Sequence, residues 1–200
     1  MTMTEIINPF ESYFDGKHDW HTLGLYRRYP AISAEQFKAI FSRHPGGLVV
    51  ITAEGPGGPV ALTASSLASV SADPPLMVFS LSGLSSSTAA IVAADTAVVH
   101  FIDVESMHIA KLAATSGVDR FADTTQWSRL ETGEPVYHVV PAWIRVHPIE
   151  RMIAGSSTVM VAQGVEASMP AEALTALQSR DGLAYVNREW HRLGPSSSIG

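Results

Sequence analysis

The sequence predicts a mainly β fold, a barrel or a sandwich, from three observations. Seven short apolar runs follow one another along the chain with turn residues between them. Residues 55–59 read Gly-Pro-Gly-Gly-Pro between two of these runs, which is typical of a hairpin connection. Ile144 and Val146 alternate with more polar neighbours, as in a half-buried strand. Such spacing favours antiparallel sheets over βαβ units. The expected strands are residues 48–52, 60–63, 76–81, 97–102, 143–149, 159–163 and 183–186.

A few short helices are expected beside these strands. Ser33 and Gln36 have the spacing of a capping box, so a helix begins after Ser33, and Pro-Gly-Gly at residues 45–47 ends it. Three more helices are expected, at residues 87–94, at 105–115 with Asp103 as cap and Gly117 after the end, and at 171–180 following Pro170.

The chain divides into an arm, a domain and a tail. Residues 1–32 show little periodicity but hold many aromatic side chains, which free tails rarely do. We therefore expect this arm to pack on the domain or on a partner subunit, and the alternative is a poorly ordered leader that docks weakly. Residues 33–194 form the predicted domain, and residues 195–200 a flexible tail.

Composition excludes several classes of function. The 200 residues carry 19 acidic and 13 basic side chains, a net charge of −6, which argues against a broad nucleic-acid surface. There is no cysteine, and hence no disulfide, iron–sulfur cluster or thiol nucleophile. The first residues lack the pattern of a signal peptide, and no run is long enough to cross a membrane. We therefore expect a cytoplasmic protein without nucleic-acid or membrane partners. The scattered histidines predict no metal site.

One stretch of the chain is suited to an anion. Residues 44–110 contain no Lys or Arg, yet they hold two hydroxyl-rich segments, 63–66 and 85–88. The second leads into an expected helix, whose free N–H groups could bind a phosphate. The alternative is simple N-capping of that helix by Ser85 or Ser86. A bound phosphate would take its counter-charge from elsewhere, from Arg120, Arg43 or Arg151.

The most specific motif is residues 63–76, Thr-Ala-Ser-Ser-Leu-Ala-Ser-Val-Ser-Ala-Asp-Pro-Pro-Leu. It resembles the flavin reductase-like family of FMN-binding split β-barrels. The resemblance spans residues 37–193 in the family's order, through segments 77–80, 86–88, 99–102, 119–122 and 183–193.

The resemblance implies a Greek-key split β-barrel that forms a homodimer with flavin near the subunit interface. It implies hydride transfer from NADH or NADPH to FMN, with FAD possible, and delivery of reduced flavin to a flavin-dependent monooxygenase as one fate. No acid–base pair is needed, so no catalytic side chain is assigned. The cofactor-binding residues that it implies are Thr63, Ala64, Ser65, Ser66, Ser80, Leu81, Ser82, Ser86, Ser87, Thr88, Phe101, Ile102 and Arg120.

One segment departs from the family pattern. Many members carry Gly-Asp-His in the late strand pair, where the histidine helps to place the nicotinamide, and here residues 155–157 are Gly-Ser-Ser. A hydroxyl cannot supply an imidazole ring face. Ser157, Tyr185 and Arg188 remain as candidates for the nicotinamide side. An FMN-binding protein without nicotinamide-dependent turnover is therefore the alternative function.

Overall fold

The computed structural model describes residues 31–140, 142–168 and 180–199. The chain separates into two units, Met1–Lys38 and Ala39–Gly200. The arm predicted for residues 1–32, apart from its last two residues, lies outside the described part, as does the helix predicted at 171–180, apart from Arg180. The described end of the first unit holds the start of helix α1 (Ala34–Phe41). Its capping box is confirmed, because the Gln36 N–H donates to Ser33 Oγ at 3.1 Å and the Ser33 N–H donates to Gln36 Oε1 at 3.0 Å.

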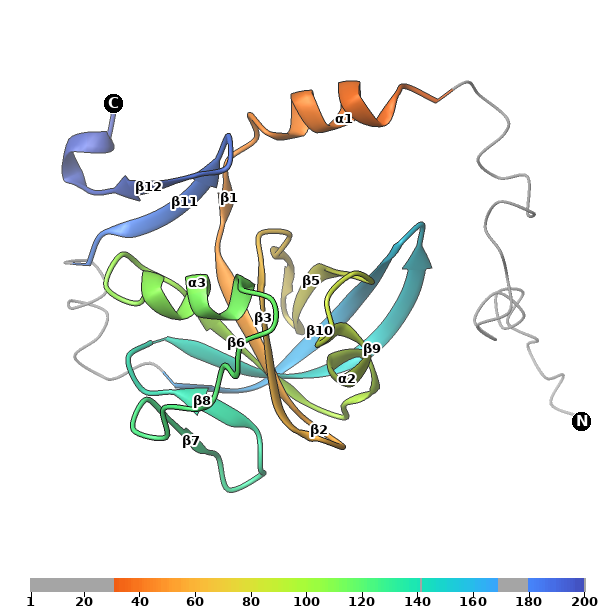
Figure 1. Ribbon diagram of the computed structural model, residues 1–200, viewed down its shortest axis with the longest axis vertical. Helices are drawn as coiled ribbons and strands as arrows, with labels where there is room; N and C mark the ends of the chain where they lie inside the picture. Colours follow the sequence, from red (N-terminus) through yellow and green to blue (C-terminus); the bar gives the residue numbers. More distant parts are fainter. Residues whose placement is uncertain (1–30, 141, 169–179, 200) are drawn as a thin grey trace, which may run out of the picture. The chain divides into compact units, whose positions relative to one another are not determined.

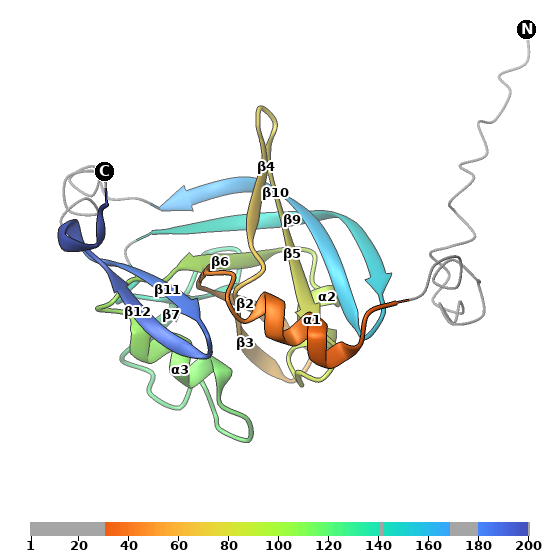
Figure 2. The same ribbon diagram turned by 90° about the horizontal axis from the view of Figure 1, so that it is seen from above.

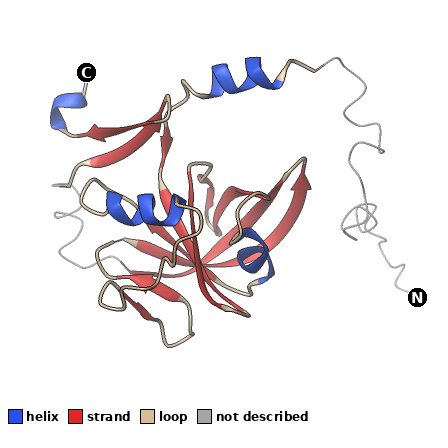
Figure 3. Cartoon of the chain, in the orientation of Figure 1, coloured by secondary structure: helices blue, strands red, loops and turns tan. Residues whose placement is uncertain are grey.

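The second unit is mainly β, as predicted, and all of its strand pairs are antiparallel (Figures 1 and 3). Seven strands form one sheet in the order β3-β2-β6-β9-β10-β5-β4. Strand β6 follows β5 in the chain but pairs with β2, as a Greek-key path requires rather than a meander. The strands are β2 (Val49–Gly55), β3 (Gly58–Ala64), β4 (Ala68–Ala72), β5 (Pro75–Ser82), β6 (Ala97–Phe101), β9 (Trp143–Ala154) and β10 (Ser157–Ser168).

The seven-stranded sheet is strongly curled. Its two outermost strands, β3 and β4, are joined by residues 65–67 alone. Such a connection spans at most about 15 Å, from Cα steps of about 3.8 Å. The outer strands of a flat seven-stranded sheet would lie about 29 Å apart, at about 4.8 Å per strand pair. The sheet must therefore bend its ends toward each other, and Figure 2 shows the β4–β5 hairpin standing out beside them.

Two smaller sheets complete the unit. The first has the order β1-β11-β12, from β1 (Gly46–Gly47), β11 (Gly182–Val186) and β12 (Glu189–Leu193). The second pairs β7 (Trp127–Arg129) with β8 (Pro135–Tyr137). Strand β11 was expected, at residues 183–186. Strands β1, β4, β7, β8 and β12 were not expected, because they are short and lie outside the apolar runs of the sequence. The predicted tail begins with a 3-10 turn, η2 (Pro195–Ser197).

Strand β2 is buried on both faces, which explains its continuous apolar run. Val49 and Ile51 belong to one hydrophobic cluster, together with Ile91 of helix α2 (Thr88–Ala93). Val50 belongs to a second cluster, together with Ile109 of helix α3 (Met107–Ala114). The two helices therefore pack on opposite faces of the β2–β3 hairpin (Figure 1).

Helix α3 begins later than expected. Ser106, and not Asp103, occupies its N-cap position. The Asp103 carboxylate instead accepts the Ser106 N–H at 2.8 Å and forms an ion pair with Arg180. Partial burial of Asp103 raises the pKa of its carboxyl. The hydrogen bond and charge of Arg180 lower this pKa, and the net shift is downward. The helix ends at Ala114, and Gly117 follows with φ +75°, a conformation suited to glycine.

Candidate functional site

A cavity of about 710 Å³ lies between the end of β3, the end of β5, the loop before α2 and the C-terminal end of α3. It gathers nine of the residues that the sequence predicted for the site. They come from four separate segments of the chain, which only the fold brings together. They are Thr63, Ala64, Ser65, Ser66, Ser80, Ser82, Ser86, Arg120 and Ser157.

Short alcohol side chains fix one wall of the cavity. The hydroxyl of Ser66 accepts the Ser80 N–H at 2.9 Å and donates to the Ser80 carbonyl at 3.0 Å. These two hydrogen bonds tie the β3–β4 connection to β5, at the point where the curled sheet brings its ends together. Thr63 donates its hydroxyl to the Ala110 carbonyl at 2.6 Å, which ties the same connection to α3. The wall is therefore polar and held in place by the fold itself.

Glycines allow close backbone approaches at this wall. A Cβ built on Gly46 would lie 2.9 Å from the Ser65 carbonyl oxygen, so β1 approaches the cavity residue Ser65 as only a glycine permits. At the other side, the Gly83 N–H donates to the Ser156 carbonyl at 2.8 Å. That bond places the turn between β9 and β10, and hence Ser157, at the cavity.

Arg120 is the one charged residue among those that line the cavity. Its Nε donates to the Ala113 carbonyl at 3.1 Å and its Nη2 to the Thr115 carbonyl at 2.8 Å. These acceptors are free carbonyls at the end of α3, so the helix orients the guanidinium while the arginine caps the helix. The cavity therefore carries a fixed positive charge and no lining carboxylate.

The loop before α2 divides its hydroxyls between the cavity and the protein. Ser85 and Ser86 line the cavity. Ser87 is buried and donates to the Ala61 carbonyl at 2.9 Å, and Thr88 is buried and donates to the Ser82 carbonyl at 2.6 Å. The structure therefore places Ser87 and Thr88 outside the lining, because their hydroxyls are used to fasten the loop.

The remaining predicted residues also lie outside the lining. Leu81 and Ile102 are buried in the two hydrophobic clusters. Phe101 lies at the end of β6, where its side chain is 38% exposed. Tyr185 and Arg188 lie on the β11–β12 hairpin. Tyr185 is one strand away from the cavity wall, because it pairs with Gly46.

Several lining residues were missed by the sequence prediction. The signal for one group was present, because Gly117 had been identified as a helix end and the residues before it are small. What the sequence does not reveal is that the end of α3 faces β3. The missed lining residues are Leu62, Leu84, Ser85, Ala113, Ala114, Ser116 and Gly117.

Two buried groups near the site hold the scaffold rather than face the cavity. Burial lowers the pKa of His100 to about 4, so its ring is neutral near pH 7. Its Nε2 accepts the Tyr137 N–H at 3.2 Å, so Nδ1 carries the proton that bonds to the Val50 carbonyl. Burial also raises the pKa of Tyr137, whose hydroxyl donates to the Arg120 carbonyl at 2.9 Å. Together they connect β2, β8 and the Arg120 segment.

Two features are absent from the part of the chain that the structure describes: a group of metal ligands and a membrane-spanning helix. Within it, no group of three His, Asp or Glu side chains could hold a metal ion. No described helix is long and apolar enough to cross a membrane.

Comparison with known proteins adds the family context. Residues 41–194 match the model of the flavin reductase like domain. An NADH:FMN oxidoreductase of Rhodococcus qingshengii is 40% identical over 130 residues, which cover 65% of this chain and 68% of the relative. A flavin reductase domain protein from Arthrobacter sp. FB24 has a TM-score of 0.72 at 27% identity, over 80% of this chain and 96% of that one. Nitrilotriacetate monooxygenase component B from Mycobacterium thermoresistibile has a TM-score of 0.71 at 23% identity, over 83% and 89% of the two chains, which shows the fold.

Proposed function

Because this chain belongs to the flavin reductase-like domain family, we propose that it is an enzyme that reduces FMN with NADH. The observation that carries the proposal is that a chain matching this family has a cavity whose lining is rich in serine and threonine and includes one arginine. FAD as flavin and NADPH as donor remain within the proposal. The 40% identical relative is named for the NADH and FMN pair.

The cavity residues fit a flavin mononucleotide. A volume of about 710 Å³ lies within the range of about 300–1,000 Å³ that small-molecule sites occupy. Ser65, Ser66 and Ser80 leave room for a flat ring. The hydroxyls of Ser65 and Ser80 would serve its polar edge, while the Ser66 hydroxyl holds the Ser80 backbone. Arg120 with Ser85 and Ser86 would hold the phosphate, since an arginine and hydroxyls are suited to that group. Ser87 and Thr88 would support this phosphate loop through their bonds to the Ala61 and Ser82 carbonyls.

When bound, the flavin ring supplies the hydride acceptor, and the protein supplies position and electrostatics. Thr63 and Ser66 hold the wall through their bonds to Ala110 and Ser80, so the ring meets a fixed surface. Arg120 would balance the negative charge of the phosphate, and the cavity lining has no carboxylate that would repel the phosphate. The lining contains no histidine, carboxylate or lysine, so it provides no side chain of the kinds that usually move a proton.

A second subunit would cover the open side of the cavity. Met152, Val159 and Ser80 lie directly opposite one another on β9, β10 and β5, so their side chains share one face. This is the outward face, because Phe79 and Leu81, the neighbours of Ser80, point into the core. On this face, the apolar side chains of Met152 and Val159 therefore lie beside the cavity residue Ser80. We propose that a homodimer buries it, and that dimerisation completes the flavin site.

The fate of the reduced flavin is a further part of the proposal. The similarity to a component of nitrilotriacetate monooxygenase supports transfer to a flavin-dependent monooxygenase. A cytoplasmic location would suit this reaction, because NADH is available there.

The test is an anaerobic titration of the full chain with FMN, followed by addition of NADH. Loss of the 450-nm flavin band at a catalytic ratio of protein to flavin supports the proposed activity. An FMN-binding protein without turnover, the alternative suggested by Ser157, would become yellow but leave the band unchanged. An absence of FMN binding would overturn both.

A further inference from the structure

The turn that joins β11 to β12 has an unusual backbone. Val186 pairs with Glu189, so the turn consists of Asn187 and Arg188. Their φ angles are +52° and +65°, the pattern of a type I′ turn. Asparagine is common at the first position of this turn, but the second position normally holds glycine, because a side chain there is strained. Arg188 therefore occupies a position at which glycine would adopt the same backbone conformation with less strain.

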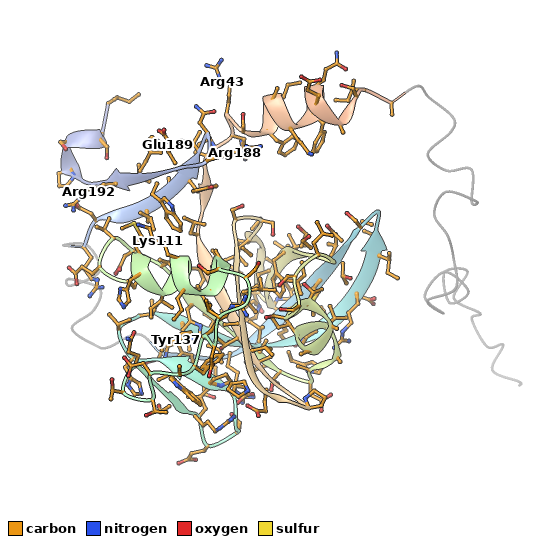
Figure 4. All side chains as sticks on the ribbon, in the orientation of Figure 1. Arg43, Lys111, Tyr137, Arg188, Glu189 and Arg192 are labelled. Carbon is orange, nitrogen blue, oxygen red and sulfur yellow. The ribbon has the colours of Figure 1, made fainter. Side chains whose placement is uncertain are left out.

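A second arginine lies beside this turn. The Asn187 N–H donates to the Ser42 carbonyl at 2.6 Å, which fixes the turn against the chain just before β1. Arg43 follows Ser42 directly, and both Arg43 and Arg188 are exposed. Figure 4 shows the two side chains at this end of the hairpin. Two guanidinium groups thus project from neighbouring backbone segments.

These two arginines differ from the others of their unit. Six arginines of Ala39–Gly200 bond to a carboxylate or to a backbone carbonyl; they are Arg120, Arg129, Arg145, Arg151, Arg180 and Arg192. Within the described residues, neither Arg43 nor Arg188 forms an ion pair, although Glu189 is next in the chain. These two exposed positive charges are therefore available to an anionic ligand.

The hairpin also connects this pair to the cavity. Tyr185 pairs with Gly46, and a Cβ on Gly46 would lie 2.9 Å from the carbonyl oxygen of the cavity residue Ser65. Arg188 is three residues farther along the hairpin, about 10 Å at about 3.3 Å per residue. The pair is therefore outside the cavity but along the hairpin that borders its wall. Part of a ligand too long for the cavity could reach it.

We propose that Arg43 and Arg188 bind a phosphate group of the nicotinamide dinucleotide while its reduced ring meets the flavin in the cavity. The proposal rests on the function proposed above. Arginine binds phosphate through a planar fork of donors, and two exposed arginines project here from neighbouring backbone segments. The phosphate is either one of the pyrophosphate, present in NADH and NADPH, or the 2′-phosphate of NADPH. Both have the same chemistry, and the experiment separates them.

The experiment compares Arg43→Gln, Arg188→Gln and the double variant with the unchanged protein in FMN reduction. Arg192→Gln is the matched control, because it removes the same charge from the same hairpin but from an arginine paired with Asp181. If the pair binds the pyrophosphate, KM for NADH and NADPH rises about tenfold in the double variant, the effect of two exposed charge contacts. KM for reduced nicotinamide riboside, which carries no phosphate, should not change. If the pair binds the 2′-phosphate, only KM for NADPH rises.

Direct binding gives a second readout that does not depend on turnover. Calorimetric titration with ADP-ribose tests the pyrophosphate. 2′,5′-ADP carries a 5′-phosphate as well as the 2′-phosphate, so 5′-AMP is titrated beside it. A loss with 2′,5′-ADP, but not with 5′-AMP or ADP-ribose, assigns the 2′-phosphate. The double variant should lose about tenfold in affinity for one of these probes, and the control should lose none. Added salt should weaken the same interaction in the unchanged protein.

Two results would decide against the proposal. Unchanged KM values and unchanged probe affinities in the double variant would overturn it, and the pair would then serve another contact, such as an acidic surface of a partner protein. An equal loss of affinity in Arg192→Gln would also overturn the proposal. The effect would then come from the removal of any positive charge on the hairpin, and not from this pair. If the unchanged protein binds ADP-ribose through the pair but never reduces FMN, the proposed function fails while the binding site stands.

Discussion

The Ser66 hydroxyl bonds twice to the backbone of Ser80, accepting its N–H at 2.9 Å and donating to its carbonyl at 3.0 Å. This pair joins the β3–β4 connection to β5 and continues the β4–β5 ladder, in which Ala68 pairs with Val78. The same two serines line the cavity. A single side chain therefore fixes the connection between the outermost strands to β5 and shapes the proposed flavin site.

Replacing Ser66 with alanine should cost about 1 kcal/mol of unfolding free energy, the usual net value of such hydrogen bonds. It should also weaken FMN binding, because the wall loses its fixed position. Urea unfolding and FMN fluorescence titration measure the two effects. Ser65→Ala is the control for stability, since the Ser65 hydroxyl makes no hydrogen bond within the described residues. Equal losses of stability in both variants would contradict the role given to Ser66.

Replacing Arg120 with methionine should weaken binding of FMN but not of riboflavin. The reason is that Arg120 is the one charge in the cavity lining, and only FMN carries a phosphate. We expect an increase of about tenfold in the FMN Kd, from the loss of one charge-assisted contact of about 1.5 kcal/mol. Competition between the two flavins in fluorescence titration measures the difference. A parallel loss for riboflavin would assign Arg120 to the helix end alone, where it caps α3.

Gly46 and Gly47 form a matched pair for testing the cavity wall. A Cβ on Gly46 would lie 2.9 Å from the Ser65 carbonyl oxygen, whereas nothing lies within 4 Å of a Cβ on Gly47. Gly46→Ala should therefore displace the Ser65 backbone, destabilise the fold by about 1–3 kcal/mol as overpacking does, and weaken FMN binding. Gly47→Ala should change neither. Thermal unfolding and flavin titration compare them, and identical behaviour would show that the close approach is relaxed in solution.

His100 predicts a specific pH dependence of stability. Burial lowers its pKa from 6.5 to about 4 in the folded protein, so the unfolded chain binds a proton at a higher pH than the folded chain does. Stability from this group is fully present above pH 6.5 and falls as the pH drops from 6.5 to 4. The full loss is about 3 kcal/mol, at about 1.36 kcal/mol per pKa unit.

The measurement for His100 is urea unfolding at a series of pH values. His100→Gln should be less stable at pH 7 but show a smaller slope between pH 6.5 and pH 4. The paired carboxylates contribute in a different range, because ion pairs and hydrogen bonds lower the pKa values of Asp103 and Glu134. Their contribution is present above the unfolded pKa, near 4, and is lost below it. An unchanged slope in His100→Gln would refute the assignment.

Replacing Arg188 with glycine should stabilise the protein by about 0.5–1 kcal/mol, because glycine adopts a positive φ without strain. The same variant removes one guanidinium of the proposed phosphate site, so its affinity for ADP-ribose or 2′,5′-ADP should fall while its Tm rises. Gly58→Ala is a reciprocal control, since Gly58 has φ +106° and the substitution should lower the Tm. A lower Tm in Arg188→Gly would show that the arginine supports the turn.

The sequence by itself determined the β class, most of the sheet and the chemistry of the site. Apolar runs and turn residues located the strands of the central sheet, since burial on one or both faces requires those patterns. Strand β4 and strand β12 escaped notice because they hold small or charged residues and are stabilised by pairing rather than by burial. The motif at residues 63–76 pointed to the family, and the hydroxyl-rich segments pointed to the cavity wall.

Only the tertiary structure decided which of those hydroxyls face the cavity. Ser86 lines it, whereas the neighbouring Ser87 is buried and bonded to Ala61, a distinction of side-chain direction that composition does not encode. The end of α3 joins the site because packing of Ile109 against β2 carries that helix to β3, and the pairing of Tyr185 with Gly46 brings the β11–β12 hairpin beside the same wall. These are contacts between segments far apart in the chain. They depend on how the sheet curls, which is a property of all the strands together and of no single segment.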